Sequence, residues 1–322
     1  MEWNPARTGA LSRSSQLAPG EPYLPLSWRI ENGLDHPRIQ RVSLPGNLAD
    51  WLAFGSVPFE YSPRQLAQWI CHTQGSRPFV LRGSHPAFLA WLQPAGGQVL
   101  LTGREALLDL HADHLGRKSL RELARRGRRH GEITQFGRQD LATVGERVDR
   151  FMERVRSTYS APLSYLYRTR LPESERFFVL ENAERIFGLV SLIPNGPASW
   201  HTELLARDPA APVGIMEALI GHVFATLRDE GAAYWSLGEV PFYPTAEPDN
   251  LKALALTQVG QRLDRAYSAL GLYRFKAKFH PIWRPVCVYG WPSMSWLTLA
   301  GMFWRCNGHK LMAVGLRLMA GR

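Results

Sequence analysis

The sequence predicts a mixed α/β fold, and three observations support this class. Short apolar runs bounded by Gly and Pro, such as 78–82 and 98–102, are typical of strands. Residues 214–230 place their apolar side chains at a helical period with a wide core-facing stripe. The 322 residues are 45% hydrophobic and 11% aromatic, which is enough to build the cores of two domains of ordinary size.

The first half of the chain alternates between expected strands and helices. In chain order we expect a strand, a turn and a short helix over 38–52, a helix over 63–73, strands over 78–82 and 98–102, and a basic helix up to residue 131. Residues 1–36 are rich in Pro, Ser and Gly and are predicted to form a flexible leader. We therefore predict a first α/β domain over 37–136.

The second half is expected to form another α/β domain over 137–290. In chain order we expect a helix over 141–158, a hairpin of strands over 176–181 and 185–193, a strand over 200–205, a helix over 214–230, a strand over 233–237, a helix over 250–269, and closing strands over 273–279 and 286–289. This order of strand pairs, helix, strand, helix and strand is that of an acyltransferase of the N-acetyltransferase-like class.

The helix that ends the first domain carries the densest positive charge in the chain. Over 117–129 it has seven cations against the single acid Glu122, namely Arg117, Lys118, Arg121, Arg125, Arg126, Arg128 and Arg129. The whole chain has a formal net charge of +10, which indicates nucleic acid or anionic lipid as partners. Such a cluster repels itself unless anions neutralise it, so we expect it to bind phosphates of an RNA acceptor stem or lipid headgroups. The alternative is a helix whose charges are merely solvated.

Residues 273–279 interleave aromatic and cationic side chains. If this run is extended, Arg274, Lys276 and Lys278 share one face, opposite an apolar face that includes Tyr273. A row of cations on a rigid strand suits a phosphate-bearing ligand, because the cations lose little entropy when they bind it. The alternative is an amphipathic edge strand whose lysines protect it from aggregation.

Two carboxylates and one arginine are further candidates for the chemistry. Glu203 and Arg207 lie in the segment 203–214, before a helix, where they could bind a donor amino group and an ester carbonyl or phosphate. This segment has prolines and one glycine instead of a Gly-rich loop that cradles the pyrophosphate of coenzyme A, which favours a different donor. Glu239 follows a strand, where ligands of open sheets gather, and could accept a proton. The alternatives are a cap and a surface pair for the first two residues, and a partner for a nearby Arg or Lys for Glu239.

Residues 291–322 form a tail that is rich in tryptophan, methionine and leucine and is interrupted by cations. Its apolar pieces are too short to span a bilayer and too aromatic to lie in water, so we predict an amphipathic helix at the membrane interface. The alternative is a helix packed on the protein's own core or on a second copy, as in a homodimer. The sequence has no apolar run of about 18 residues and no signal peptide, so we expect no spanning helix.

Several motifs occur together in a fixed order. They are the aromatic and basic run 272–285, the basic helix from residue 116, the segment 203–214, and the turn 236–241 with the sequence Ser-Leu-Gly-Glu-Val-Pro. This ordered set, over roughly residues 75–290, resembles the catalytic domain of phosphatidylglycerol lysyltransferases, the aminoacyl-phosphatidylglycerol synthases. The family has Asp at the position of Glu203, and its Arg aligns with Ala206 rather than with Arg207. The resemblance implies two N-acetyltransferase-like folds in tandem with a tunnel between them.

The resemblance also implies a function, which is aminoacyl-tRNA-dependent transfer of an amino acid to a membrane lipid such as phosphatidylglycerol. The reaction would be a transesterification. The protein itself would be cytoplasmic and peripherally attached to the inner face of the cell membrane. Under this hypothesis the site residues have these roles: Arg274, Lys276 and Lys278 hold phosphate with Tyr273 beside them, Glu203 orients the donor amine, Arg207 stabilises the oxyanion and Glu239 acts as base. No metal or bound cofactor is implied, and aminoacyl-tRNA is the co-substrate.

Two other functions are compatible with the same sequence. One is an acyltransferase of the same fold class that uses acyl-coenzyme A or an acyl carrier on a small amine or sugar. The other is a non-catalytic protein that binds RNA or membranes and is built on a decayed transferase.

Overall fold

The computed structural model describes residues 20–157, 164–166, 176–243, 247, 250–263 and 268–313. Its strands are β1 (Arg29–Ile30), β2 (Arg38–Ser43), β3 (Asp50–Val57), β4 (Phe79–Ser84), β5 (Gln98–Asp109), β6 (Glu132–Phe136), β7 (Arg176–Glu181), β8 (Ile186–Gly196), β9 (Ser199–Arg207), β10 (Tyr234–Pro241) and β11 (Ile282–Trp291). Its α-helices are α1 (Pro63–Gln74), α2 (Pro86–Leu89), α3 (Lys118–Arg128), α4 (Leu141–Ser157), α5 (Ile215–Asp229), α6 (Leu251–Leu263), α7 (Ala269–Ala277) and α8 (Trp296–Arg305). Short 3₁₀ helices are η2 (Pro45–Asn47), η3 (Gln93–Ala95) and η4 (Arg138–Asp140).

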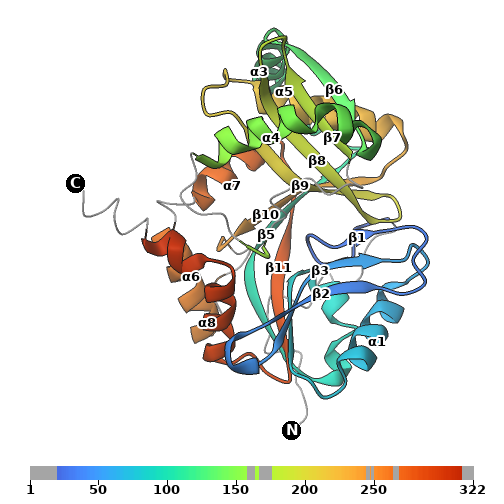
Figure 1. The fold of residues 1–322 in the computed structure, drawn as a ribbon, viewed down its shortest axis with the longest axis vertical. Coiled ribbons are helices and arrows are strands. Elements are labelled where there is room, and N and C mark those ends of the chain that lie inside the picture. The colour runs from blue at the N-terminus through green and yellow to red at the C-terminus, as the bar shows by residue number, and fades with distance from the viewer. Residues whose placement is uncertain are drawn as a thin grey trace.

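One 11-stranded sheet passes through the described part of the chain, in the order β1-β3-β4-β11-β5-β10-β9-β8-β7-β6, with β2 paired to β3. The long strands β5 and β11 run through its centre and connect a lower group of strands with an upper one (Figure 1). β11 comes from the C-terminal half but lies between β4 and β5, antiparallel to both. The mixed α/β class is confirmed. Strands from both predicted domains share this one sheet, and the division into two tandem units remains a prediction.

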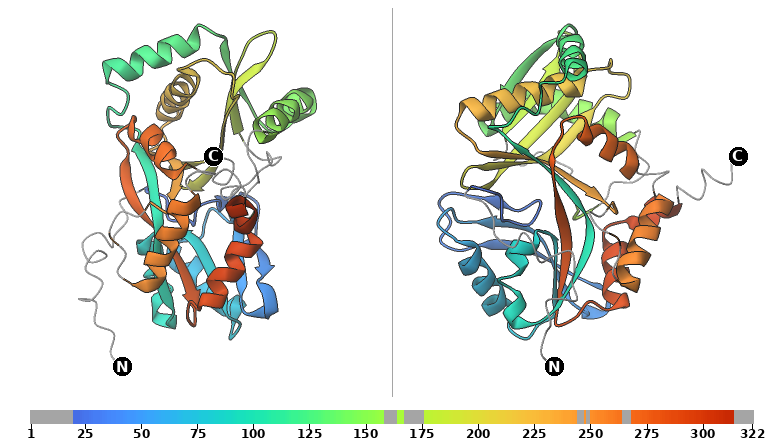
Figure 2. Two further views of the ribbon diagram at one scale, coloured as in Figure 1. Left: turned by 90° about the vertical axis from the view of Figure 1, so that its left-hand side faces the viewer. Right: turned by 180° about the vertical axis from the view of Figure 1, so that it is seen from behind.

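Helices cover both faces of the upper strands. α5 packs on one face, against side chains that include Phe178 and Val190, and α4 packs on the other, against Phe177 and Leu189. Because neighbouring residues of a strand point to opposite faces, continuous apolar runs in β7 and β8 supply both cores. Figure 2 shows α4 on one side of these strands and α3 with α5 on the other.

The lower strands are covered in the same way. Leu66 and Ile70 of α1 pack on one face, beside Leu81, while Met302 of α8 packs on the other, beside Val80. α8 also presents an outer surface, because Trp296, Leu297 and Trp304 are 52%, 65% and 60% exposed. α8 lies within the predicted tail and has one core-facing side, whereas an amphipathic membrane-interface tail over 291–322 stays a prediction; residues 314–322 lie outside the described residues.

The predicted flexible leader is wrong for its described part. Tyr23 and Trp28 are buried, and the Leu26 N–H donates a hydrogen bond to the Gly83 carbonyl at 2.8 Å. Gly83 has a φ of +78°, and a Cβ there would lie 3.0 Å from the side chain of Leu26. The apolar side chains of this segment outweigh its prolines and glycine, so 20–30 packs into the core and its last two residues form β1. Residues 1–19 lie outside the described residues.

The predicted strand over 273–279 is also wrong, because these residues form most of α7 and the turn after it. Ser268 begins the helix by accepting a hydrogen bond from the Gly271 N–H at 3.0 Å. Leu, Arg, Lys and Ala are strong helix formers, and their propensity prevails over the short alternating pattern. Lys276 is consequently buried at 3% exposure, whereas Arg274 and Lys278 are exposed, and the three do not form one row of charge.

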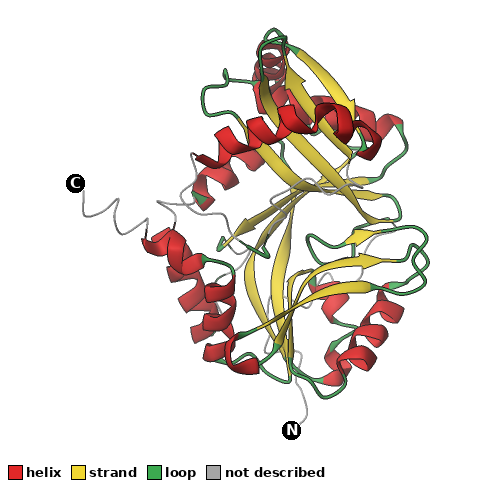
Figure 3. Cartoon of the chain, viewed as in Figure 1, coloured by secondary structure: helices red, strands yellow, loops and turns green. Residues whose placement is uncertain are grey.

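Most other predicted elements are confirmed. The hairpin of β7 and β8, the strand β9, the helix α5 and the strand β10 follow one another in the expected order. Figure 3 shows the strands and helices of this upper part of the molecule. The basic helix is α3, which packs on α5. These elements place the carboxyl ends of β9 and β10 near α7, where the candidate site lies.

Candidate active site

The site begins where two neighbouring strands separate. β9 and β10 pair in parallel over three residue pairs, the last of which joins His201 to Ser236. Beyond this point β9 stays paired with β8 and β10 stays paired with β5, but the two strands no longer pair with each other. The register of β10 shifts after Ser236, and Gly238 there adopts a φ of +84°, a left-handed conformation that favours glycine. The carboxyl ends of the two strands therefore diverge.

A cavity of about 230 Å³ occupies the space between the diverging strands. Residues 201–205 of β9 and 237–239 of β10 line two of its sides. Lys276 of α7, Arg82 of β4 and Ser27 of the N-terminal segment complete the polar part of the wall, and leucines supply the rest. A concave, largely apolar space with a few convergent polar groups is the usual form of a small-ligand site.

Lys276 and Glu239 form the buried centre of the cavity wall. The Lys276 ammonium donates a hydrogen bond to the Glu239 backbone carbonyl at 2.9 Å, and the Glu239 carboxylate accepts one from Arg82. A Cβ at position 238 would lie 3.5 Å from the Lys276 Nζ, so Gly238 leaves space open beside this ammonium. The carboxylate and the ammonium are thus held by different partners and both border the cavity.

The charges at the centre continue across the sheet. Glu239, Glu105 and Arg284 occupy directly paired positions on β10, β5 and β11, so their side chains share one face. Arg284 Nε lies 3.6 Å from Glu105 Oε2, and all three residues are at most 5% exposed. Two acids and three cations, counting Arg82 and Lys276, therefore form one buried network in which opposite charges offset the cost of desolvation.

Burial changes the acidity of both central groups. It raises the pKa of the Glu239 carboxyl, although Arg82 and Lys276 act in the opposite direction. It lowers the pKa of the Lys276 ammonium from 10.5 to about 7, with Glu239 and Glu105 opposing that change. An amine with a pKa near neutrality can accept and return a proton under physiological conditions, which an ordinary lysine cannot.

The structure brings three predicted site residues together. Glu203, Glu239 and Lys276 all line the cavity, and each is at most 6% exposed. Arg207 lies outside it, at the end of β9, where its guanidinium donates to the Ala211 carbonyl and holds the following loop. Arg207 therefore does not lie where it could stabilise the oxyanion of a carbonyl bound in the cavity, as the sequence had led us to expect.

The remaining predicted residues of α7 point elsewhere. Lys278 forms an ion pair of 2.7 Å with Glu217 of α5, and Arg274 is exposed. Tyr273 lies between Tyr243 and Trp283, with ring centroids 4.7 and 5.0 Å away. Only Lys276 of the predicted cationic row lines the cavity, because a helix turns the side chains of residues two apart to different sides.

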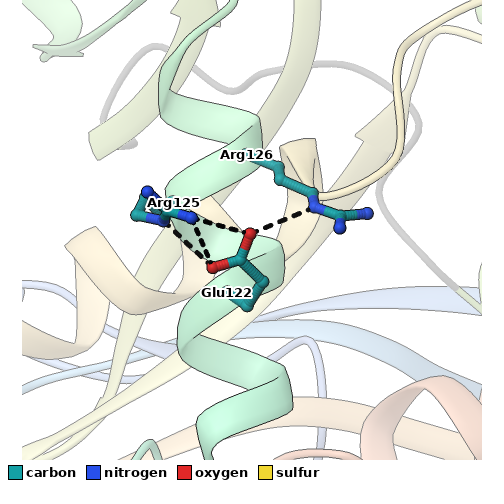
Figure 4. A network of polar contacts seen from close by, with 3 residues as sticks. All are labelled: Glu122, Arg125 and Arg126. Carbon is teal, nitrogen blue, oxygen red and sulfur yellow. Dashed lines mark hydrogen bonds and ion pairs between the residues drawn. The ribbon is translucent and has the colours of Figure 1, made fainter.

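The basic helix borders a second pocket, of about 290 Å³, between α3 and α5. Arg121, Arg125 and Arg128 line it together with Glu217. Figure 4 shows that the single acid of the helix, Glu122, binds Arg125 and also contacts Arg126. One carboxylate cannot neutralise seven exposed cations, so this surface keeps a strong positive charge.

α3 also covers the start of α5. A Cβ at Gly127 would lie 2.1 Å from the Gly214 carbonyl oxygen, and a Cβ at Gly214 would lie 2.2 Å from the Leu123 carbonyl oxygen. The two backbones touch here because both positions are glycine. α3 therefore packs directly against the residue that precedes α5.

Sequence reasoning missed several residues of the cavity and its charge network. They are Arg82, Glu105, His201 and Arg284, together with the N-terminal segment that supplies Leu26 and Ser27. A signal was available for Arg82 and Arg284, since each is the one charged residue of its strand, but not for Glu105, whose strand also contains Arg104 and Asp109. A charge in the middle of a buried strand requires a partner, but the sequence does not say which one.

Comparison with known proteins identifies the family of the chain. A sequence model described as phosphatidylglycerol lysyltransferase, C-terminal, matches residues 54–289. The chain belongs to this family. The phosphatidylglycerol lysyltransferase C-terminal domain contains the whole cavity wall except the N-terminal segment, since Arg82, Glu203, Glu239 and Lys276 all lie within the match.

Curated relatives are longer proteins. The lysylphosphatidylglycerol biosynthesis bifunctional protein LysX of Mycolicibacterium gilvum is 24% identical over 240 residues, which are 69% of this chain and 22% of that protein. The protein of the same name from Nocardia farcinica is 25% identical over 243 residues, 69% of this chain and 21% of its own length. The chain thus spans about a fifth of the length of these relatives.

Two solved structures have the same fold. One is the C-terminal domain of a proposed lysylphosphatidylglycerol synthetase from Agrobacterium fabrum, with a TM-score of 0.64 and 21% identity, covering 83% of this chain and 84% of that one. The other is L-PGS from Bacillus licheniformis, with a TM-score of 0.62 and 19% identity, covering 84% and 85%. Within the described residues, none of the helices is both long and apolar enough to cross a membrane.

Proposed function

We propose that this chain transfers an aminoacyl group from aminoacyl-tRNA to a hydroxyl group of a membrane lipid such as phosphatidylglycerol. The observation that carries the proposal is the cavity between β9 and β10, where Glu203, Glu239 and Lys276 converge in a member of the phosphatidylglycerol lysyltransferase family. The names of the curated relatives, which refer to lysylphosphatidylglycerol biosynthesis, support the same reaction class.

The proposed reaction is a transesterification with Lys276 as the proton carrier. The lipid hydroxyl oxygen attacks the carbonyl carbon of the aminoacyl ester and gives its proton to the neutral Lys276 amine. The tetrahedral intermediate then breaks its bond to the ribose oxygen of the tRNA, which takes the proton back from the ammonium. A pKa of about 7 suits both halves of this cycle at neutral pH.

The two acids of the cavity have different parts in the proposal. Glu203 is buried at 6% exposure on the wall opposite β10, and its charge suits the ammonium group of the donor amino acid. Glu239 binds Arg82, which favours the role of charge partner over that of catalytic base. By holding Arg82 and lying beside Lys276, Glu239 sets the charge balance that the proton carrier experiences.

The outer surfaces are proposed to bind the macromolecular substrates. The exposed cations of α3 suit tRNA phosphates, because binding to a polyanion draws on many exposed charges at once. The exposed Trp296, Leu297 and Trp304 of α8 suit an anionic lipid surface, with Arg305 and Lys310 exposed beside them. Peripheral attachment at the inner face of the cell membrane through α8 is thus part of the proposal, and contact between two copies through the same face is its alternative.

The proposal is tested by lipid mass spectrometry on a bacterial host that expresses the chain. The wild-type chain should produce a lipid heavier by one aminoacyl residue, whose mass names the amino acid. Lys276→Met keeps a side chain of similar length but has no amine, so the product should fall by about 10²-fold or more. Lys278→Met is the matched control two residues further along the chain, and its product should stay within about threefold because the Lys278 side chain is 44% exposed and does not line the cavity.

The decisive result is the contrast between the two variants. If folded wild-type protein yields no new lipid, the proposed reaction fails. If both variants make the lipid as well as the wild type does, the reaction stands and the role of Lys276 fails. Purified protein with aminoacyl-tRNA and phosphatidylglycerol vesicles repeats the measurement without other host enzymes.

The acyl-coenzyme A reaction is the less favoured candidate. It needs an accessible helix N-terminus for the pyrophosphate, and at α5 the helix α3 packs directly against Gly214, the residue before that terminus. Acetyl-coenzyme A should therefore leave the melting temperature of the protein unchanged. A saturable rise in the melting temperature would support the acyl-coenzyme A reaction instead.

A further inference from the structure

His201 is a buried histidine of the cavity wall to which the sequence assigns no role. It lies on β9 at the last residue pair shared with β10, immediately before the strands diverge. It is 4% exposed and lines the cavity, and its ring Nδ1 is 3.2 Å from the Ser236 hydroxyl oxygen. The backbone on both sides is held by strand pairing, so the position of the ring is fixed.

The hydrogen bonds of Ser236 determine which ring nitrogen carries the proton. The Ser236 oxygen is fully buried and already accepts a hydrogen bond from the Gly238 N–H at 3.0 Å. Its own proton then needs an acceptor, and among the described residues the group in reach is Nδ1 of His201. A neutral imidazole that accepts at Nδ1 carries its hydrogen on Nε2.

The surroundings keep this ring neutral. Burial, followed by the positive charge of Lys276, lowers the pKa of His201 to about 3. The charged groups that share the cavity are Lys276 from α7, Glu203 on the same strand, Glu239 on β10 and Arg82 on β4. A buried imidazole beside an ammonium stays uncharged, and as a neutral donor it can polarise a carbonyl without competing for the proton that Lys276 moves.

The space beside Gly238 indicates where a carbonyl would lie. A Cβ built on Gly238 would meet Lys276 Nζ at 3.5 Å, the Thr202 carbonyl oxygen at 3.6 Å and His201 Cε1 at 3.8 Å. The glycine therefore leaves a small space that is bounded by the amine on one side and by the imidazole edge on the other. Among the described residues, no hydrogen-bond partner is found for the Nε2 of His201.

We propose that the Nε2–H of His201 donates a hydrogen bond to the carbonyl oxygen of the aminoacyl ester and holds the negative charge that develops on it. This inference rests on the proposed function and supplies the oxyanion donor that Arg207, at the far end of β9, does not provide. When the lipid hydroxyl attacks, the carbonyl π electrons move to the oxygen beside Nε2–H, and the hydroxyl proton goes to Lys276. When the intermediate collapses, the carbonyl forms again, the ribose oxygen leaves, and Lys276 returns the proton.

The first test uses the protein alone and needs no turnover. Nuclear magnetic resonance of protein with ¹⁵N-labelled histidine reports which nitrogen of each ring is protonated. His201 should give the Nε2–H form without titration between about pH 5 and 8, and Ser236→Ala should weaken this preference for one tautomer. An Nδ1–H form, or a ring that titrates near its ordinary pKa, overturns the inference.

The second test links the donor to substrate. The probe is an aminoacyl adenosine with an amide in place of the ester, which keeps the carbonyl and cannot be transferred. Its binding should shift the Nε2 proton resonance of His201, while His85, a half-buried histidine that does not line the cavity, stays unchanged. An unchanged His201 signal at saturating probe overturns the inference even if the wild-type enzyme is active.

Kinetics separate this role from a structural one. His201→Ala should lower kcat by about 10²-fold with little change in KM, since the bond strengthens as charge develops. His201→Gln retains a neutral N–H donor and should recover part of the loss, provided that circular dichroism and melting show a folded chain. A His201→Ala enzyme with wild-type kcat overturns the inference, whereas a wild-type enzyme without turnover refutes the proposed function itself.

Discussion

The cavity between β9 and β10 and the basic pocket between α3 and α5 both depend on charge, but they hold it in opposite ways. The cavity buries its charges and offsets them, with Lys276 at 3% exposure beside Glu239 and Arg82. The basic pocket leaves its charges in water, where Arg121 and Arg128 are exposed. α7 contributes to both regions, since Lys276 faces the cavity and Lys278 binds Glu217, which lines the basic pocket.

The difference shows what each region can do chemically. Burial moves the pKa of Lys276 to about 7, so the amine can exchange a proton during a reaction. The charges of the exposed arginines are screened by salt, and a guanidinium suits the attraction of a polyanion rather than proton transfer. Activity should therefore follow the cavity, and substrate affinity should follow α3.

The largest effect on substrate binding is expected at the basic pocket. Reversing Arg121, Arg125 and Arg128 to Glu should weaken tRNA binding by about 10²-fold at moderate salt and make its salt dependence shallower by about two to three units of slope. The turnover number at saturating tRNA should change little, because the cavity is untouched. Fluorescence anisotropy with labelled tRNA over a salt series measures both affinity and slope.

A matched variant separates local binding from net charge. The exposed Arg38, Arg41 and Arg64 lie among the lower strands and α1, and reversing all three changes the net charge by the same amount. This control should bind tRNA within about threefold of wild type. Equal losses in the two triple variants would show that overall charge, not the α3 surface, attracts the tRNA.

A smaller effect is expected of pH on kcat, and its cause is the titration of Lys276 in the cavity. With a folded pKa of about 7, the neutral fraction of Lys276 and hence kcat should rise about tenfold between about pH 6 and pH 8. Steady-state rates with phosphatidylglycerol, corrected for spontaneous hydrolysis of the aminoacyl ester, measure this rise. A flat profile over that range would remove Lys276 as the proton carrier.

The same shift predicts how stability depends on pH. The folded pKa of Lys276 is lowered below its ordinary value of 10.5, so between about pH 7 and 10.5 the unfolded chain binds a proton that the folded chain has lost. The free energy of unfolding should consequently gain a contribution that rises with pH across this window. Urea titrations at several pH values should show that contribution in the wild type and not in Lys276→Met.

The sequence was sufficient for most of the fold because most elements have one clear periodicity. The apolar runs of β7 and β8 and the wide stripe of α5 each predict a single structure. The prediction of a strand over 273–279 was wrong because an alternating pattern of seven residues is compatible with a short helix as well as with a strand. The prediction of a flexible leader was wrong for 20–30 because it rested on the prolines of this segment and overlooked Tyr23 and Trp28, which are buried.

The candidate site was predictable only in part, for a different reason. Glu203, Glu239 and Lys276 lie in motifs that resemble those of the family, so they could be named before their neighbours were known. Arg82 could not be paired with Glu239, because 157 residues separate them and only strand order brings them together. The pKa of Lys276 depends on burial, which no local pattern around an apparently solvated lysine reveals.

The smallest expected effect concerns a third kind of surface, the apolar outer face of α8. Trp296→Ser together with Leu297→Ser should weaken binding to phosphatidylglycerol vesicles by about fivefold, because two side chains that are 52% and 65% exposed can no longer enter the lipid interface. Co-sedimentation with phosphatidylglycerol and with neutral phosphatidylcholine vesicles measures this loss and its dependence on lipid charge. Turnover of a short-chain, water-soluble phosphatidylglycerol should stay unchanged.

Trp91→Ser is the control for that experiment, since Trp91 is 49% exposed and follows α2 rather than belonging to α8. It should leave vesicle binding intact, because a single exposed aromatic residue elsewhere on the surface does not form part of the docking face. If the α8 variant instead binds vesicles normally but changes its sedimentation equilibrium from dimer to monomer, α8 is a contact between two copies. The lipid would then have to reach the cavity without help from α8. Of the two exposed surfaces proposed to bind substrates, α3 alone would keep that role.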